Sequence, residues 1–323
     1  MLVDKTVPDV RTPKVSVVLP TFNAAGTILT AVESVLAQSM PDLELIVCDD
    51  GSNDQTGDVL GRVRDPRLRV IANAANMGPG AARDKAISGA RGVWVALIDA
   101  DDAWTPNRLE RLLEAAGNDR DVLVFDDVMV CHDSGGTLVP WRPVHGRFAY
   151  GADGSNAQDV LLENYIRAER LLIKPVMPAA VIRAHGLRHT ARRFAEDAEF
   201  FIRLGLAGVA MRYLPEPLYL YRVSPGSLTA SGRDWTLMRQ CLEDCARLEG
   251  MPDTGRRALA DKIAALHTNE ALYELAEQFR RGNLVGILRL LAKEPRTLRV
   301  LPRRLLRHLS YQVHRVRHGA QGR

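Results

Sequence analysis

Three acids crowd the end of an apolar run in the first third of the chain. The run spans residues 93–98, and Asp99, Asp101 and Asp102 follow it within four positions. The run predicts a buried strand, and carboxylates packed at its end repel one another and lose solvation. A divalent cation would offset that repulsion, and carboxylate oxygens suit Mg²⁺ or Mn²⁺. The alternative is a solvated turn whose acids only cap the helix predicted after Pro106.

Two earlier apolar runs end in the same way. Residues 15–19 and 43–48 each predict a buried strand, and a helical pattern follows each of them. Strands that alternate with helices form parallel units, and such sheets bind ligands beyond the carboxyl ends of their strands. The three clusters are therefore expected to converge on one site. The residues after the two earlier runs are Pro20, Thr21, Asn23, Asp49 and Asp50.

The sequence lacks the common phosphate-binding loops. The first run is followed by PTFNAAG rather than G-x-G-x-x-G, and no G-x-x-x-x-G-K-[ST] occurs. Both absences argue against a dinucleotide-binding Rossmann unit and a P-loop. A phosphate in this site would have to be held through a metal ion and arginines.

Composition indicates a large globular protein. The 323 residues are 46% hydrophobic and 25% charged, which allows a sizeable core. The four cysteines show no metal-ligand spacing and fit a reduced, cytoplasmic protein. Residues 1–14 lack the apolar segment of a secretory signal, and no run approaches the roughly 20 apolar residues that cross a bilayer. We therefore expect a cytoplasmic location, with peripheral membrane contact at most.

Four segments together resemble the donor-binding half of family 2 glycosyltransferases of the bacterial exopolysaccharide and succinoglycan type. They are VSVVLPTFNAAGTI, LIVCDDGSNDQT, NMGPGAARDKAI and LIDADDAWTPNRLE. Four motifs in order are far more specific than one D-x-D. The resemblance implies an α/β glycosyltransferase A-type fold with a mixed, mostly parallel sheet flanked by helices. It also implies a catalytic domain over residues 15–230, after an N-terminal tail of residues 1–14.

The resemblance assigns the donor site. Asp49 or Asp50 would accept a hydrogen bond from the nucleotide base, beside Pro20, Thr21 and Asn23 on the first loop. One of the two acids would instead cap the following helix.

Arg83 matches an arginine that approaches the diphosphate, since a guanidinium suits that group. The alternative is a surface ion pair with Asp84, which stands where the family usually has Asn.

The D-x-D motif is expected to hold the metal. Asp101 would be the ligand, Asp99 would lie near the ribose or the metal's water shell, and Asp102 would position both. Mn²⁺ or Mg²⁺ would neutralise the charge that develops on the departing nucleoside diphosphate.

Glu196 and Asp197 resemble the family's E-D motif at a helix start. Asp197 would be the general base for the acceptor hydroxyl, and Glu196 would orient it or contact the sugar. The alternative is a pair of first-turn acids that only stabilise the helix.

Other parts of the acceptor side are less defined. Residues 132–158 are polar and Gly-rich and predict a loop over the site. Ser224 stands where many members of the family have a His that would make a third metal or phosphate contact, and Arg222 or Ser227 is the candidate to substitute for it.

The last part of the chain differs in pattern and charge. Residues 231–323 predict helices, and residues 280–323 hold eleven Arg and one Lys against the single acid Glu294. The amphipathic segment 296–318 could lie on an anionic membrane surface. The alternative is a helix packed on its own domain. Nucleic acid is not expected as a partner, because no aromatic platform or zinc spacing accompanies the charge.

The function expected from these features is inverting, metal-dependent sugar transfer. The donor would be a nucleotide-diphospho-sugar, with UDP as the expected nucleotide. The acceptor would be a saccharide, expected to be lipid-linked, in surface polysaccharide biosynthesis. Two alternatives are a nucleotide-sugar-binding module without turnover and a nucleotidyltransferase that releases pyrophosphate.

Overall fold

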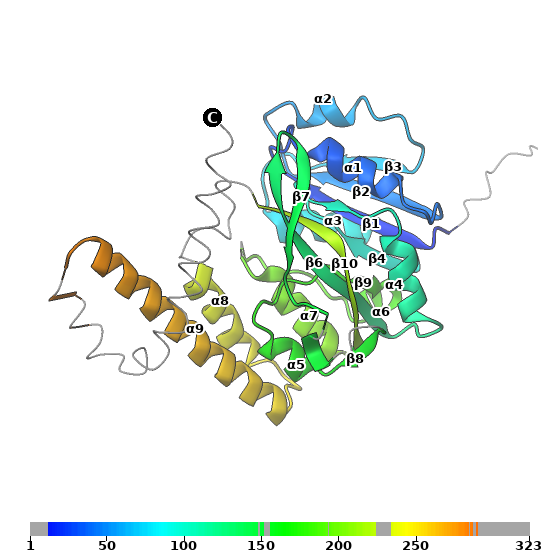
Figure 1. Cartoon of the computed structure of the whole chain (residues 1–323). Coiled ribbons are helices and arrows are strands. Elements are labelled where there is room, and N and C mark those ends of the chain that lie inside the picture. Colours follow the sequence, from blue (N-terminus) through cyan, green and yellow to red (C-terminus); the bar gives the residue numbers. More distant parts are fainter. Residues whose placement is uncertain are drawn as a thin grey trace, which may run out of the picture.

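The protein has an α/β fold built on a mixed sheet, as expected. The computed structural model describes residues 12–289 apart from 148, 152–155, 193, 224–233, 284 and 287–288. Within these residues a sheet of ten strands is covered by helices on both faces (Figure 1). Ser224, Ser227 and the predicted amphipathic segment 296–318 lie outside the described residues, so their roles stay predictions.

The first third of the chain forms the parallel part of the sheet. Strands β3, β2, β1 and β4 lie in that order and run parallel to one another. Their carboxyl ends therefore meet at one edge. The elements are β1 (Val15–Thr21), α1 (Ile28–Leu36), β2 (Leu43–Asp49), α2 (Thr56–Leu60), β3 (Leu68–Ala72), α3 (Pro79–Ser88) and β4 (Trp94–Leu97).

The strands that follow β4 in the sequence extend the sheet and run in both directions. After β4 the order continues β9, β6, β10 and β5, with β9 antiparallel to β4 and β6, and β6 parallel to β10. This arrangement brings β10 beside the acids that follow β4. The elements are β5 (Ala103–Trp104), α4 (Arg108–Ala116), β6 (Val122–Ser134), β7 (Thr137–Pro143), β8 (Gln158–Val160), α5 (Leu162–Arg167), β9 (Val176–Pro178), α6 (Ala179–Ala184), α7 (Glu196–Leu206) and β10 (Ala210–Val223).

The predicted loop over residues 132–158 is partly wrong. Strand β6 continues to Ser134 and turns back as β7, so that Ser134 pairs with Thr137. Gly135 and Gly136 form the turn with φ values of 62° and 90°, which a two-residue hairpin favours and most side chains avoid. The glycines that suggested a loop are therefore the turn of a hairpin.

The core lies on both faces of the sheet. In β1, Val17 and Leu19 join an apolar cluster with α1 and α4, whereas Val18 faces a second cluster with α3 and α7. All seven residues of β1 are buried. Burial on both faces explains why the strands read as continuous apolar runs rather than as alternating patterns.

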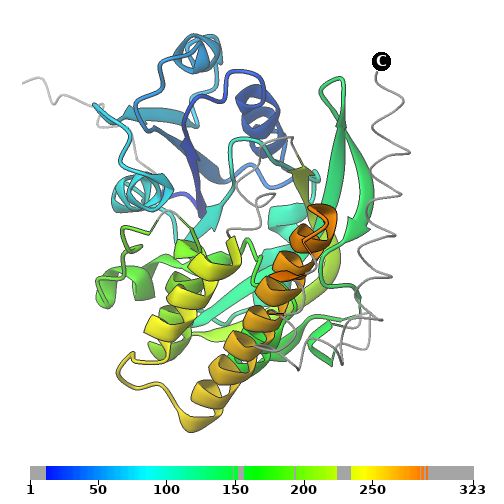
Figure 2. The same cartoon turned by 90° about the vertical axis from the view of Figure 1, so that its left-hand side faces the viewer.

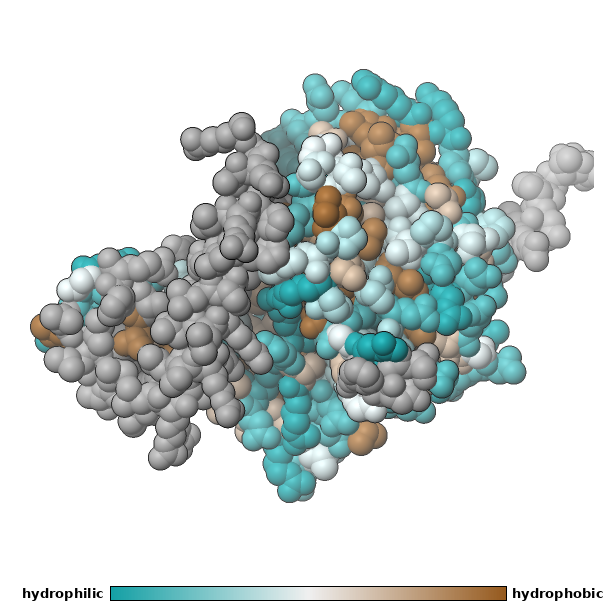
Figure 3. All heavy atoms as spheres, in the orientation of Figure 1, coloured by the Kyte–Doolittle hydropathy of each residue, from teal (hydrophilic) through white to brown (hydrophobic). Residues whose placement is uncertain are grey.

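Two helices lie outside the sheet layer. Helices α8 (Asp234–Cys245) and α9 (Asp253–Arg280) lie side by side, and α9 packs on α5 (Figures 1 and 2). Leu242 and Leu259 join the same apolar cluster as α7. In the view of Figure 3 the described surface is mainly hydrophilic, with apolar side chains in separate patches. Among the described helices none combines the length and apolar character of a membrane span.

Candidate active site

The loops after β1 and β2 are joined by hydrogen bonds. The Asn23 amide oxygen accepts Asn53 N–H at 2.9 Å, and Asn23 N–H donates to Ser52 Oγ at 2.9 Å. Asp49 Oδ1 accepts Ser52 N–H at 2.9 Å and so closes the turn after β2. The prediction that Asp49 or Asp50 caps α2 is wrong, because Asp54 is the acid that accepts Thr56 N–H, at 3.0 Å. Pro20 and Thr21 are the last residues of β1. The buried Thr21 hydroxyl has no hydrogen-bond partner among the described residues.

Asp50 is buried and holds the loop that leads into α3. Its carboxylate accepts Asn73 Nδ2–H at 2.7 Å, Gly78 N–H at 2.8 Å and Met77 N–H at 3.0 Å. These contacts fix the position of a buried acceptor beside the ends of β1 and β2. They also use most of its capacity, since a carboxylate offers about four acceptor sites.

Asp102 is buried in the loop after β4. It accepts the Tyr219 hydroxyl at 2.6 Å and Arg222 N–H at 2.8 Å. Burial, together with Asp101 and Asp99, raises the pKa of Asp102 well above its usual range. Strand β10 therefore fixes this loop through the innermost acid.

Arg222 is also buried against this loop. Its Nε donates to the backbone oxygen of Asp101 at 2.6 Å, and its guanidinium pairs with Asp133. The structure thus shows Arg222 supporting the loop of acids. Its contact with a donor stays a prediction.

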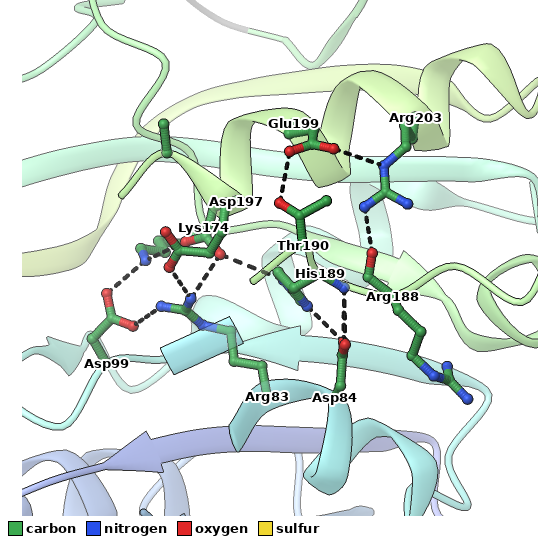
Figure 4. A network of polar contacts seen from close by, with 12 residues as sticks. Arg83, Asp84, Asp99, Lys174, Arg188, His189, Thr190, Asp197, Glu199 and Arg203 are labelled. Atoms are coloured by element: carbon green, nitrogen blue, oxygen red, sulfur yellow. Dashed lines mark hydrogen bonds and ion pairs between the residues drawn. The ribbon is translucent and has the colours of Figure 1, made fainter. Parts of the chain in front are cut away.

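Asp99 shares two cations with Asp197, although the two acids are distant in the sequence. Arg83 Nη2 lies 2.8 Å from Asp99 and Nη1 lies 2.9 Å from Asp197. Lys174 Nζ lies 2.6 Å from Asp99 and 3.2 Å from Asp197 (Figure 4). Burial alone would raise the pKa of Asp99, but Lys174 and Arg83 outweigh it and lower the pKa.

The E-D pair opens α7, as expected from its pattern. Glu196 pairs with Arg83 Nη1 at 2.6 Å. Burial would raise the pKa of Asp197, but Arg83, Lys174 and His189 hold it well below its usual range. The preceding Ala195 has φ of 63°, a left-handed conformation that costs an Ala side chain on the order of 1 kcal/mol. Such strain is typical of functional sites, because the surroundings must enforce it.

Arg83 is therefore not the surface arginine of the alternative interpretation. It is 4% exposed and contacts three carboxylates, whereas Asp84 pairs with His189. The structure brings together Arg83, Asp99, Glu196 and Asp197, which lie in three separate motifs of the sequence. Asp101 and Asp102 adjoin this cluster through the loop after Asp99.

The side chains near Asp99 and Asp101 suit a metal ion only in part. No group of three or more His, Cys, Asp or Glu side chains in the described part of the chain is arranged to hold a metal ion. Asp101 pairs with no cationic side chain among the described residues, and burial and Asp99 raise its pKa. That unbalanced charge fits an ion held by one or two carboxylates together with substrate phosphates, as is usual for Mg²⁺.

Two residues of the cluster, Lys174 and His189, were not predicted from the sequence. Lys174 is the only cation in the apolar stretch 171–178, and that isolation was the available signal. His189 lies in a basic segment where nothing distinguished it. Both come from the connections between α5, β9, α6 and α7, whose paths cannot be read from local patterns.

Comparison with known proteins identifies the family and the fold. Residues 16–171 match the pattern of Glycosyl transferase family 2. Two succinoglycan biosynthesis proteins of Rhizobium meliloti are similar. ExoO is 28% identical over 96% of this chain and 91% of its own, and ExoU is 31% identical over 79% and 74%. An Escherichia coli protein named UDP-Glc:alpha-D-GlcNAc-diphosphoundecaprenol beta-1,3-glucosyltransferase WfaP is 36% identical over 29% of this chain and 38% of its own.

A solved structure shows the same fold. TarS of S. aureus in complex with UDP has a TM-score of 0.60 and 22% identity, over 82% of this chain and 74% of that one. The sequence resemblance is thereby confirmed for family and fold. The chain belongs to glycosyl transferase family 2 and is a glycosyltransferase with the glycosyltransferase A-type fold.

Proposed function

We propose that this enzyme transfers a sugar from a UDP-sugar to a saccharide hydroxyl, with inversion at the anomeric carbon and with Mn²⁺ or Mg²⁺ as cofactor. The observation that carries this proposal is the pair of cations that Asp99 and Asp197 share. Asp99, which is expected to face the nucleotide-sugar, and Asp197, which is expected to face the acceptor, thus both contact the guanidinium of Arg83.

The donor would lie across the carboxyl ends of β1, β2 and β4. Asp50 is held in place by backbone N–H groups, and the Thr21 hydroxyl is buried without a partner among the described residues. Both would bond the uracil or ribose, with Pro20 at the end of β1 and Asn23 in the loop that follows it. Arg83 is close enough to Asp99 to reach a diphosphate there.

The proposed ion would be held by Asp101, with Asp99 in or near its water shell. When bound, it supplies positive charge to the diphosphate as the nucleotide leaves. Asp102 keeps the loop in position through Tyr219 and β10.

Asp197 is the proposed general base. As the acceptor oxygen bonds to the anomeric carbon, the bond to the diphosphate breaks, UDP leaves, and the hydroxyl proton passes to Asp197. Its lowered pKa keeps Asp197 ionised but makes it a weak base. Arg83 and Lys174 lower that pKa, so a diphosphate that attracts both cations would raise the basicity of Asp197. Glu196 would orient Arg83 or contact the sugar.

The proposed acceptor is a saccharide on a membrane lipid, in surface polysaccharide biosynthesis. The names of the succinoglycan proteins and of the E. coli glucosyltransferase support this class of acceptor. The basic segment 296–318 would place the enzyme on an anionic membrane surface, with the catalytic domain in residues 15–230.

A panel of UDP- and GDP-sugars with Mn²⁺, Mg²⁺ or EDTA tests the proposal, with nucleotide release as the readout. We expect slow, metal-dependent release of UDP from one UDP-sugar without any acceptor. Asp101→Ala should abolish metal-dependent donor binding in calorimetry. Asp197→Asn should keep binding and lose turnover.

Other results would favour the alternatives. Tight binding without turnover with any saccharide would indicate a binding module, and pyrophosphate release would indicate a nucleotidyltransferase. Near-normal turnover by Asp197→Asn would disprove the assignment of the base.

A further inference from the structure

His189 lies fixed between two acids in the segment before α7. Its ring Nδ1 lies 2.7 Å from Asp84 Oδ1, and its backbone N–H donates to the same carboxylate at 2.9 Å (Figure 4). The ring stacks on Phe200, with centroids 4.2 Å apart and planes 5° from parallel. The side chain is fully buried. Few rotations are therefore open to this imidazole.

The other ring nitrogen faces the proposed base. His189 Nε2 lies 3.5 Å from Asp197 Oδ1 and has no hydrogen-bond partner among the described residues, whereas Asp197 Oδ1 has the ion pair with Arg83 Nη1 at 2.9 Å but no hydrogen bond of normal geometry. A shift of about half an ångström would bring the two atoms to a normal hydrogen-bond length. The charged groups that face the ring are Asp84 and Arg83 from α3 and Asp197 from α7.

We propose that His189, held by Asp84, is the positioning residue of Asp197. It donates from Nε2 to Asp197 and so keeps the carboxylate turned toward the acceptor hydroxyl. This inference rests on the proposed function, because it assigns a partner to the proposed base. Nothing in the four motifs of the family resemblance includes this contact.

The role requires a ring that donates from both nitrogens. Asp84 accepts from Nδ1 and Asp197 would accept from Nε2, so the imidazolium satisfies two carboxylates at once. An Asn at position 84 would lack the charge that favours this form.

The protonation state of the ring gives the proposal a pH signature. Burial alone would lower the pKa of His189, and Arg83 acts in the same direction. Asp197 and Asp84 outweigh both and raise the pKa above its ordinary value of 6.5. The imidazolium therefore persists to a higher pH than in a free histidine, and turnover should fall on the alkaline side as the ring loses its proton.

Kinetics of four variants test the proposal, with UDP release from UDP-glucose or UDP-N-acetylglucosamine and Mn²⁺ as the assay. His189→Phe keeps the stacking but removes both donors, and should lower kcat about 10–100-fold with little change in donor KM. His189→Gln can still donate to Asp197 and should recover most of that loss, without the alkaline fall. Asp84→Asn should move the alkaline fall to lower pH. His185→Gln is the matched control, since His185 is exposed at the end of α6.

An NMR titration of the ring nitrogens provides a second measurement that needs no substrate. His189 should titrate above the ordinary value in the wild type, and Asp84→Asn and Asp197→Asn should each lower its pKa. Asn has almost the same volume as Asp, so the Asp84→Asn variant still tests the proposal if the His189→Phe variant fails to fold.

The outcomes separate the inference from the proposed function. A wild-type enzyme that is active and unaffected by His189→Phe overturns the inference alone. An unchanged His189 titration in Asp84→Asn and Asp197→Asn does the same. A wild type that turns over no nucleotide-sugar overturns the proposed function, and the positioning role with it.

Discussion

Two buried arginines, Arg108 and Arg83, are both held by carboxylates but differ in how many they contact. Arg108 forms a two-pronged pair with Asp126 alone, at 2.7 and 2.9 Å. Arg83 is shared among Asp99, Glu196 and Asp197. One region is balanced in charge and the other has more acids than this arginine can satisfy.

The Arg108 region is closed to solvent. Both side chains of the pair are 0% exposed, and the guanidinium lies over the rings of Trp104 and Tyr219 at 4.6 and 5.1 Å. Burial outweighs Arg108 and raises the pKa of Asp126. Such a pair contributes little net stability, but losing one partner leaves a buried charge. Its role is architectural.

The Arg83 region is open on one side. The side chains of Asp99 and Asp197 are 25% and 20% exposed, so a ligand can reach the acids that the arginine bridges. Cations in such a cluster can be redistributed when an anionic ligand arrives. The difference between the two regions shows how the same residue types serve architecture when closed and paired, and chemistry when shared and reachable.

Lys174 connects the two regions. Its backbone oxygen accepts a hydrogen bond from Arg108, while its Nζ contacts Asp99 and Asp197. The balanced pair therefore fixes the backbone from which the shared cation extends. We expect damage to the Arg108 pair to reach the active site through this residue.

The largest effect on stability is expected from Arg108→Met. The change leaves Asp126 buried without its partner, and should lower the free energy of unfolding by about 3–5 kcal/mol in urea denaturation. Arg111→Met on the same helix is the control, since its ion pairs are partly exposed and worth less than about 1 kcal/mol. The double variant Arg108→Met/Asp126→Leu should recover most of the loss. If the single variant matches the control, the pair is not the architectural element described.

Arg83→Lys should separate activity from stability. The charge remains, but an ammonium cannot span three carboxylates and a diphosphate as a guanidinium does. We expect about a 100-fold loss in kcat/KM, equivalent to ~2.7 kcal/mol, with less than about 1 kcal/mol lost in unfolding. Donor turnover and urea denaturation of the same preparation measure both. A larger loss of stability than of activity would make Arg83 architectural, like Arg108.

Much of the fold could be predicted from the sequence because its signals are local. The runs ending at Leu19, Cys48 and Ile98 mark strands, since a strand buried on both faces needs an unbroken apolar run. The hairpin of β6 and β7 was missed because Gly135 and Gly136 were interpreted as loop residues. Two glycines indicate a hairpin turn rather than an open loop when the residues on both sides of them have the pattern of a strand.

The site was predictable only where its residues lie in motifs. Asp99, Asp101 and Asp197 stand next to strand ends or a helix start, where patterns are informative. Lys174 and His189 lie in connections, and their contacts depend on how α6 and α7 return to the sheet. Long-range pairing of this kind has no local signal, so only coordinates reveal it.

Tyr219 contacts both regions, through its ring and through its hydroxyl, and Tyr219→Phe should remove only the hydroxyl contact. The ring lies under Arg108, while the hydroxyl donates to Asp102 and accepts Asp99 N–H at 3.1 Å. Removing the hydroxyl keeps the ring contact and leaves a buried acid short of a donor, at a cost of about 1–3 kcal/mol. We expect weaker metal-dependent donor binding in calorimetry and a modest loss in unfolding. Unchanged donor binding would show that Asp102 does not position the acids before it.

The smallest effect is expected at a third pair, Arg91 with Glu44, where the arginine is half exposed. Glu44 also accepts the Ser16 hydroxyl at 2.6 Å. Burial would raise the pKa of Glu44, but Ser16 and Arg91 outweigh it and lower the pKa. A lowered pKa gives stability that is present above the unfolded value of about 4.5 and is lost as pH falls through the folded value.

Arg91→Ala should therefore cost less than about 1 kcal/mol at pH 7, and less still at high salt. It should also move the acid loss of stability to higher pH, because the remaining Ser16 contact lowers the pKa of Glu44 less. Urea denaturation at neutral and acid pH, at low and high salt, measures both changes. A loss as large as that of Arg108→Met would mean that exposure does not govern the strength of these pairs, and the contrast between the closed and open regions would lose its physical basis.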